Sequence, residues 1–93
     1  MLQKLIKDFL QYLEIEKNRS KKTAENYKHY LSRFLDFSKI ENPDEITADI
    51  IRDYRLFLNR LKDAKNREIK KITQNYHLIA LRSFLKYLVK RNI

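Results

Sequence analysis

The 93-residue sequence contains no glycine and a single proline, Pro43. Tight β-hairpin turns usually need glycine, because glycine adopts positive φ at little steric cost. A chain without glycine is therefore poorly suited to a sheet of short, tightly connected strands. Leucine, lysine and glutamate favour helices, and all three are abundant here. The sequence predicts an all-α domain.

Apolar residues recur at three- and four-residue spacing in four segments. Ser20 and Thr47 precede two of these segments and are predicted to be N-caps, and Asn18 is predicted to end the first helix. Residues 63–70 form a charged loop or an extension of the third helix. The chain length and the short connections predict one domain, residues 1–93, folded as a compact four-helix bundle. The predicted helices cover residues 2–17, 21–38, 48–63 and 71–91.

Composition excludes several classes of function. Cysteine is absent, so the chain has no disulfide framework and no thiolate metal site. His29 and His77 fall on different predicted helices, without carboxylates at metal-ligand spacing, and both are expected at the surface. No apolar run approaches the length of a membrane span. We expect a cytoplasmic, soluble domain with no cofactor, no metal, no catalytic residue and no membrane partner.

Positive charge is concentrated in the second half of the chain. The formal net charge is +9. Residues 1–46 hold nine basic and eight acidic groups, whereas residues 47–93 hold twelve basic and four acidic groups, and no acid follows Glu68. A helix that needs only solubility usually mixes both signs and gains ion pairs. A helix whose polar side is purely cationic instead favours a polyanion, with nucleic acid as the leading candidate.

Two rows of polar side chains have the chemistry of DNA contacts. Lysine and arginine neutralise phosphates, arginine also bridges guanine, and asparagine or glutamine bridges adenine. Tyr27 and Tyr76 neighbour these rows and are predicted to turn into the core, while the rows turn outward on a common surface. The predicted DNA-binding residues are Lys22, Asn26, His29 and Arg33 in the second helix, and Lys71, Gln74, Asn75, Arg82 and Lys86 in the fourth.

Three segments resemble the N-terminal core-binding domain of tyrosine recombinases of the phage-integrase and Xer type. SKKTAENY at residues 20–27 is similar to the family's S-x-x-T-x-x-x-Y opening, and DEIT at 44–47 to its I-T start of the third helix. TQNYHLIALRSFLKYL at 73–88 is similar to its T-x-N-R-x-L-S-A-L-R-S-F-F-x-Y-L block. Two positions depart from the family pattern, because Lys70 stands where serine is frequent and Tyr76 where arginine is frequent.

The resemblance implies a SAM-like bundle that forms one jaw of a clamp around duplex DNA, with its second and fourth helices facing the DNA. It also implies a separate catalytic domain bearing a tyrosine nucleophile, and contacts with other recombinase protomers on DNA. The isolated domain is expected to be a monomer without catalytic activity. Two alternatives remain open, namely a free-standing module that docks an acidic protein and an RNA-binding bundle.

Overall fold

The computed structural model describes residues 1–93 and contains four α-helices and one short 3₁₀ helix. No strand is present, and the only β-type pairing is an isolated antiparallel bridge between Lys62 and Glu68. This arrangement confirms the predicted all-α, four-helix fold. No helix is both long enough and apolar enough to cross a membrane. The elements are α1 (Leu2–Ile15), α2 (Lys21–Ser38), η1 (Pro43–Glu45), α3 (Ala48–Arg60) and α4 (Lys71–Lys90).

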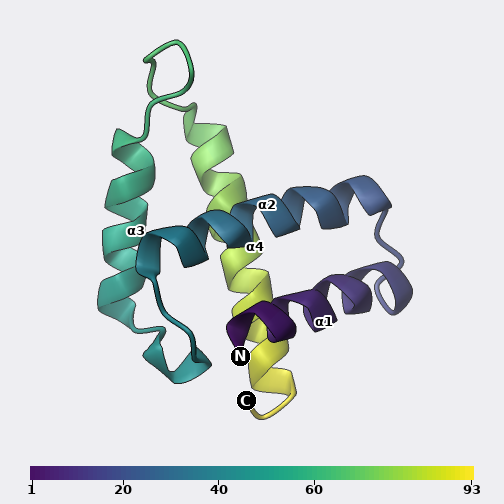
Figure 1. Ribbon diagram of the computed structural model, residues 1–93. Coiled ribbons are helices and arrows are strands. Elements are labelled where there is room, and N and C mark those ends of the chain that lie inside the picture. Colours follow the sequence, from purple (N-terminus) through teal and green to yellow (C-terminus); the bar gives the residue numbers. More distant parts are fainter.

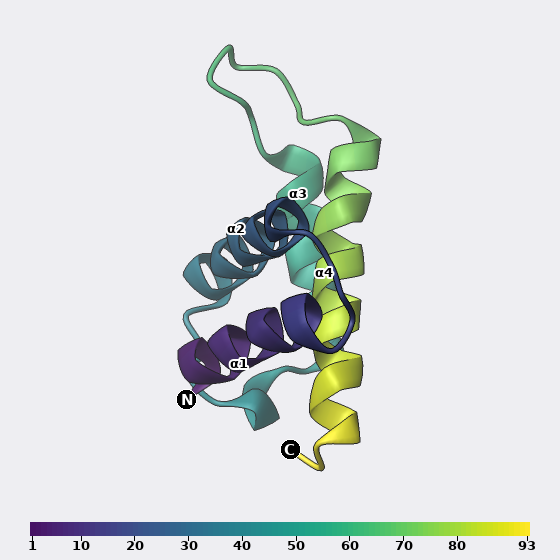
Figure 2. The same ribbon diagram turned by 90° about the vertical axis from the view of Figure 1, so that its right-hand side faces the viewer.

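The four helices form two antiparallel pairs that cross each other. Figures 1 and 2 show α1 and α2 side by side in one layer, with α3 and α4 in a second layer behind them. The connection between α3 and α4 projects beyond the end of the bundle. Because α2 and α1 cross α4 at successive levels, the outer side of α4 stays uncovered over its whole length.

Polar side chains set the helix starts that the sequence predicts. Ser20 Oγ accepts a hydrogen bond from the Thr23 amide at 3.1 Å, and Thr47 Oγ1 accepts one from the Ile50 amide at 3.2 Å. Both N-caps are therefore confirmed. Asn18, with φ of 53°, follows the end of α1 in the left-handed region, as predicted.

Two helices are shorter than their apolar patterns predict. The first ends at Ile15 instead of residue 17, and the third ends at Arg60 instead of residue 63. In the second case the Asp63 carboxylate accepts hydrogen bonds from the Lys65 and Arg67 amides, at 2.8 and 2.9 Å. A side chain that satisfies nearby backbone amides competes with helix continuation. The loop alternative for residues 63–70 is therefore the correct one.

Aromatic side chains from all four helices meet in the core. Phe9 packs on Phe84 with ring centroids 5.5 Å apart, and Phe34 meets Tyr54 edge to face at 5.0 Å. Tyr54 is fully buried, and its hydroxyl has no hydrogen-bond partner. Burial raises the pKa of Tyr54 far above its usual value. This core fixes which side of each helix remains available for function.

Candidate nucleic-acid interface

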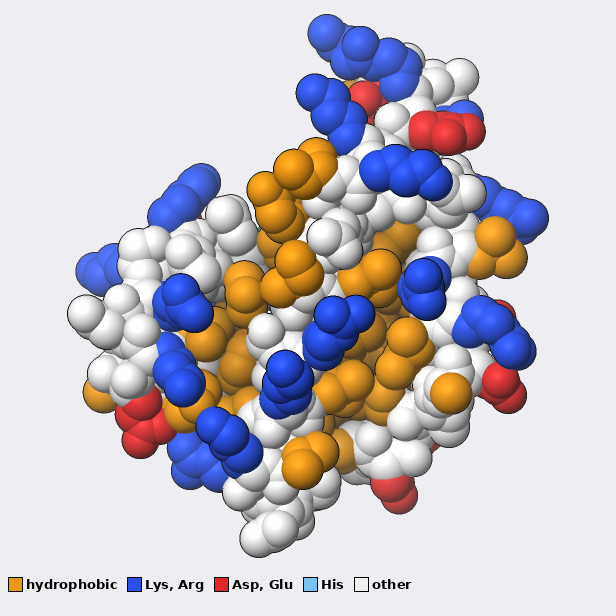
Figure 3. Space-filling model, turned by 180° about the vertical axis from the view of Figure 1, so that it is seen from behind, with side chains coloured by type: hydrophobic (Ala, Val, Ile, Leu, Met, Phe, Trp, Pro, Cys, Tyr) orange, Lys and Arg blue, Asp and Glu red, His pale blue; other side chains and the backbone are white.

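The outer face of α4 carries cations without acidic neighbours on the same helix. Lys71, Asn75, Arg82 and Lys86 are all exposed, and none of the three cations among them forms an ion pair with a carboxylate. Figure 3 shows this face, where Lys and Arg side chains lie over hydrophobic groups and acidic side chains stay at the margins. The structure therefore brings together four of the predicted residues.

A shallow groove between α3 and α4 extends this face. Asn75 and Arg82 line it together with Arg55 of α3, over an apolar floor that includes Leu78 and Leu85. Arg55 was not among the residues predicted from sequence. In the structure Arg55 has no acidic partner, whereas Arg52, one turn earlier, pairs with Asp49.

The polar row of α2 is less uniform than the pattern predicts. Lys22 and His29 are exposed, and Asn26 is half-buried. Arg33 is also half-buried, and its Nη1 donates to His77 Nε2 at 3.0 Å. The predicted outward orientation is wrong for Arg33, because α2 crosses α4 at this level. Asp36, which lines the same groove as His29 and Arg33, further reduces the local positive charge.

His77 lies inside the bundle, and the prediction that it lies at the surface is wrong. Its side chain is 1% exposed, and its ring centroid lies 4.4 Å from that of Tyr30. Nδ1 lies 2.8 Å from the Thr73 carbonyl oxygen. A carbonyl can only accept, so Nδ1 carries the proton and Nε2 accepts from Arg33. Burial, together with the positive charge of Arg33, lowers the pKa of His77 and keeps the ring neutral.

His77 and Asn75 point in nearly opposite directions, about 200° apart at 100° per residue. His29 and Arg33 meet α4 on the His77 side, since the ring centroids of His29 and His77 are 6.2 Å apart. The α4 row faces the other way. The sequence predicted one common surface for both rows. At the level of Arg33 the two rows do not share a surface.

Two further residues of α4 differ from expectation. Gln74 is half-buried, and its Nε2 donates to the Ile69 carbonyl at 3.1 Å, so this amide nitrogen closes the turn before the helix. Tyr76 is 46% exposed, and the prediction that it enters the core is wrong. Ile72 and Ile79 on the same side are also exposed, because the crossing helices cover α4 elsewhere.

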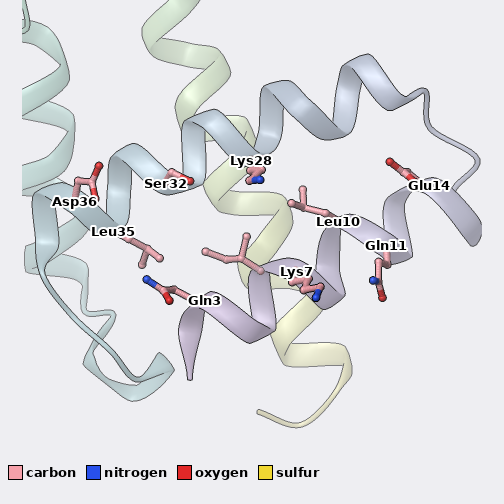
Figure 4. Close-up of a pocket in the computed structure, with 10 residues that line it drawn as sticks. Gln3, Lys7, Leu10, Gln11, Glu14, Lys28, Ser32, Leu35 and Asp36 are labelled. Carbon is pink, nitrogen blue, oxygen red and sulfur yellow. The ribbon is translucent and has the colours of Figure 1, made fainter.

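A further groove of the molecule has a different character. It lies between α1 and α2, has a volume of about 480 Å³, and is shown in Figure 4. Lys7 and Lys28 lie along it between two carboxylates, those of Glu14 and Asp36. A groove with two cations and two carboxylates along its rim offers no net attraction to a polyanion. The molecule also contains no group of three or more His, Cys, Asp or Glu side chains placed to hold a metal ion.

Fold and surface together define a small all-helical domain with an unpaired cationic face. Residues 6–92 match the family model described as "Phage integrase, N-terminal SAM-like domain". The chain belongs to this family, and the predicted resemblance to tyrosine recombinases is confirmed.

Tyrosine recombinases are among the curated proteins that the chain resembles. The chain is 35% identical over 85 residues to tyrosine recombinase XerC of Anoxybacillus flavithermus, covering 91% of this chain and 27% of that protein. It is 31% identical over 88 residues to XerC of Bacillus subtilis, covering 95% of this chain and 28% of that protein. The chain thus spans less than a third of these relatives. No solved structure matches the chain.

Proposed function

We propose that this domain binds duplex DNA at a recombination core site and positions a separate catalytic domain of a tyrosine recombinase. The observation that carries the proposal is the outer face of α4. Lys71, Arg82, Lys86 and Lys90 of this helix are exposed and unpaired, and the helix contains no acid. The family membership supplies the biological setting, since the matched relatives are named as recombinases.

The contacts of this face are mainly electrostatic. Lysine and arginine side chains on DNA displace condensed counterions, so the logarithm of the binding constant falls linearly with the logarithm of salt concentration. Asn75 and Arg82 of α4 are exposed, and both side chains suit base edges. In the proposed function, phosphate contacts set the position of the domain, and other recombinase protomers bind the same DNA alongside it. The domain itself performs no chemistry.

Arg82→Ala/Lys86→Ala tests the proposal. Alanine preserves helix propensity, and both side chains are exposed, so the fold is expected to persist. Fluorescence anisotropy with a labelled duplex is expected to show weaker binding, and a salt slope reduced by about 2, or about 1 per lost phosphate contact. Lys7→Ala/Lys28→Ala is the matched control, because it removes the same charge from the mixed-sign groove between α1 and α2.

An unchanged salt slope in Arg82→Ala/Lys86→Ala would refute the assignment of this face. Single-stranded DNA and structured RNA probes separate the remaining possibilities. Preference for structured RNA would replace duplex DNA as the partner. If the wild-type chain binds no nucleic acid even at low salt, an acidic protein becomes the better candidate.

A further inference from the structure

A second cationic groove lies where the α1–α2 connection meets the C-terminal half of α4. Its polar lining comes from three separate parts of the chain, and sequence periodicity gives no reason to group them. The floor is aromatic and aliphatic, and includes Tyr12 and Tyr87. The cationic and hydroxyl side chains of the lining are Lys17, Arg19, Thr23, Ser83, Lys86 and Lys90.

The groove carries an uncompensated positive charge. None of its four cations forms an ion pair with a carboxylate, and no acidic side chain lines it. Glu16 precedes Lys17 in sequence, but its carboxylate pairs with Arg91 at 3.6 Å. Arg91 in turn lies over the Tyr87 ring, with its Cζ 5.0 Å from the ring centroid. Glu16 is therefore paired with a cation that does not line the groove.

The cations of the connection are held in place by the fold. The Lys17 amide donates to the Tyr12 carbonyl at 3.2 Å, and the Arg19 amide donates to the Leu13 carbonyl at 2.9 Å. Lys17 Nζ also lies 5.9 Å from the centroid of the Tyr12 ring, within the range of a cation–π contact. These bonds fix the backbone that carries both cations before any ligand binds, which reduces the ordering cost of binding.

The chemistry of the lining selects a phosphate group. Lysine, arginine and hydroxyl side chains are the usual donors to phosphate oxygens. The lining contains no asparagine or glutamine, which are the side chains that read adenine. Lys86 belongs both to this groove and to the outer face of α4, so the groove continues the surface assigned above to DNA.

We propose that this groove seats one backbone phosphate of the bound duplex, with Lys17 and Arg19 as contacts that reach it from outside α2 and α4. The proposal rests on the proposed DNA-binding function. The contact is independent of base sequence. It sets the rotational orientation of the domain about the α4 axis on the DNA. It adds a third chain segment, the α1–α2 connection, to the interface.

The test is Lys17→Gln/Arg19→Gln, compared with Lys7→Gln/Lys28→Gln as a control of equal charge. Binding is measured by anisotropy on two duplexes of unrelated sequence at several salt concentrations. We expect affinity to fall about tenfold, equally for both duplexes, and the salt slope to fall by about 1, because one phosphate contact is lost. The control is expected to bind like wild type. Circular dichroism establishes that each variant is folded.

The charge-preserving variant Lys17→Arg/Arg19→Lys completes the design, and it is expected to restore the wild-type salt slope. Wild-type-like binding by Lys17→Gln/Arg19→Gln would overturn the phosphate seat while leaving the proposed function intact. Failure of the wild-type chain to bind any duplex would overturn the function itself.

Discussion

At the scale of single residues, His77 of α4 contacts Arg33 of α2 from inside the bundle. His77 is buried, donates from Nδ1 to the Thr73 carbonyl and accepts from Arg33 at Nε2. Protonation of Nε2 would remove that acceptor and set an imidazolium against a guanidinium. The neutral ring is thus part of the contact between α2 and α4.

This contact makes stability depend on pH. Burial lowers the pKa of His77 in the folded state below its usual value of 6.5, whereas the unfolded chain keeps that usual value. Well above pH 6.5 both states hold a neutral ring, and the free energy of unfolding no longer changes with the titration of His77. As the pH falls below 6.5 the unfolded state gains a proton first, so the free energy of unfolding decreases, by up to about 1.4 kcal/mol per pH unit.

Urea unfolding between pH 5.5 and 8 measures this dependence, and His77→Gln is expected to abolish it. His29→Gln is the matched control, because His29 is exposed and its replacement leaves the Arg33–His77 bond in place. Glu45 does not interfere, since backbone hydrogen bonds from Asn42 and Glu41 lower its pKa below 4.5. A pH dependence that survives in His77→Gln would contradict the assignment.

At the scale of helices, the sequence predicted boundaries well where a polar residue sets them. Helix α2, capped by Ser20, matches its predicted range, and α3, capped by Thr47, starts where predicted. Helix α4 also matches its predicted range to within one residue, although no side chain caps its start. Periodicity says which residues share a face, but it does not say which neighbour covers that face. Helix α4 meets partners on several sides, so its wide apolar arc led to wrong predictions for Tyr76 and His77.

The same limit explains the residues that sequence reasoning missed. Lys17 and Arg19 lie in a connection, where no periodicity applies, and they become relevant only because the fold brings them to Lys86. Arg55 lies on a different helix from Asn75 and Arg82, whose groove it shares. A surface assembled from distant segments depends on how helices cross, and local patterns do not encode the crossing.

The start of α4 lacks a side-chain cap, and this lowers the stability of the fold. Lys70 has φ −63° and ψ 149°, close to the −68° and 159° of Ser20, yet no side chain caps this helix. A cation at a helix N-terminus also opposes the helix dipole. Lys70→Ser is therefore expected to stabilise the fold by about 1 kcal/mol in urea unfolding. Lys65→Ser removes the same charge in the projecting loop and is expected to give no such gain; equal gains would rule out the cap.

At the scale of the whole molecule, positive charge is far in excess of what the fold neutralises. Five of the twenty-one Lys and Arg side chains form ion pairs, which leaves sixteen without a carboxylate partner. Such a distribution destabilises the free compact state by self-repulsion, and it attracts a polyanion at long range. Salt weakens both effects, because it screens exposed charges.

These two effects give salt opposite consequences in the free and bound states. Raising NaCl from about 30 to 300 mM is expected to raise the Tm of the free domain, because screening relieves repulsion within it. A duplex that binds only the folded chain raises Tm further. At a duplex concentration of a hundred times its Kd, it adds about 2.7 kcal/mol to the free energy of unfolding. That increment is expected to shrink over the same range. With about four phosphate contacts, the binding constant falls more than a thousandfold for each tenfold rise in salt concentration.

Thermal unfolding with and without duplex, followed by circular dichroism, measures both trends in one titration. Arg82→Ala/Lys86→Ala is expected to reduce both the salt-induced rise and the DNA-induced increment, because the same unpaired cations produce each. A free-domain Tm that falls with salt would show that ion pairs outweigh repulsion in this fold. A duplex increment that does not change with salt would show that binding does not depend on phosphate contacts, and the electrostatic account of the α4 face would then be wrong.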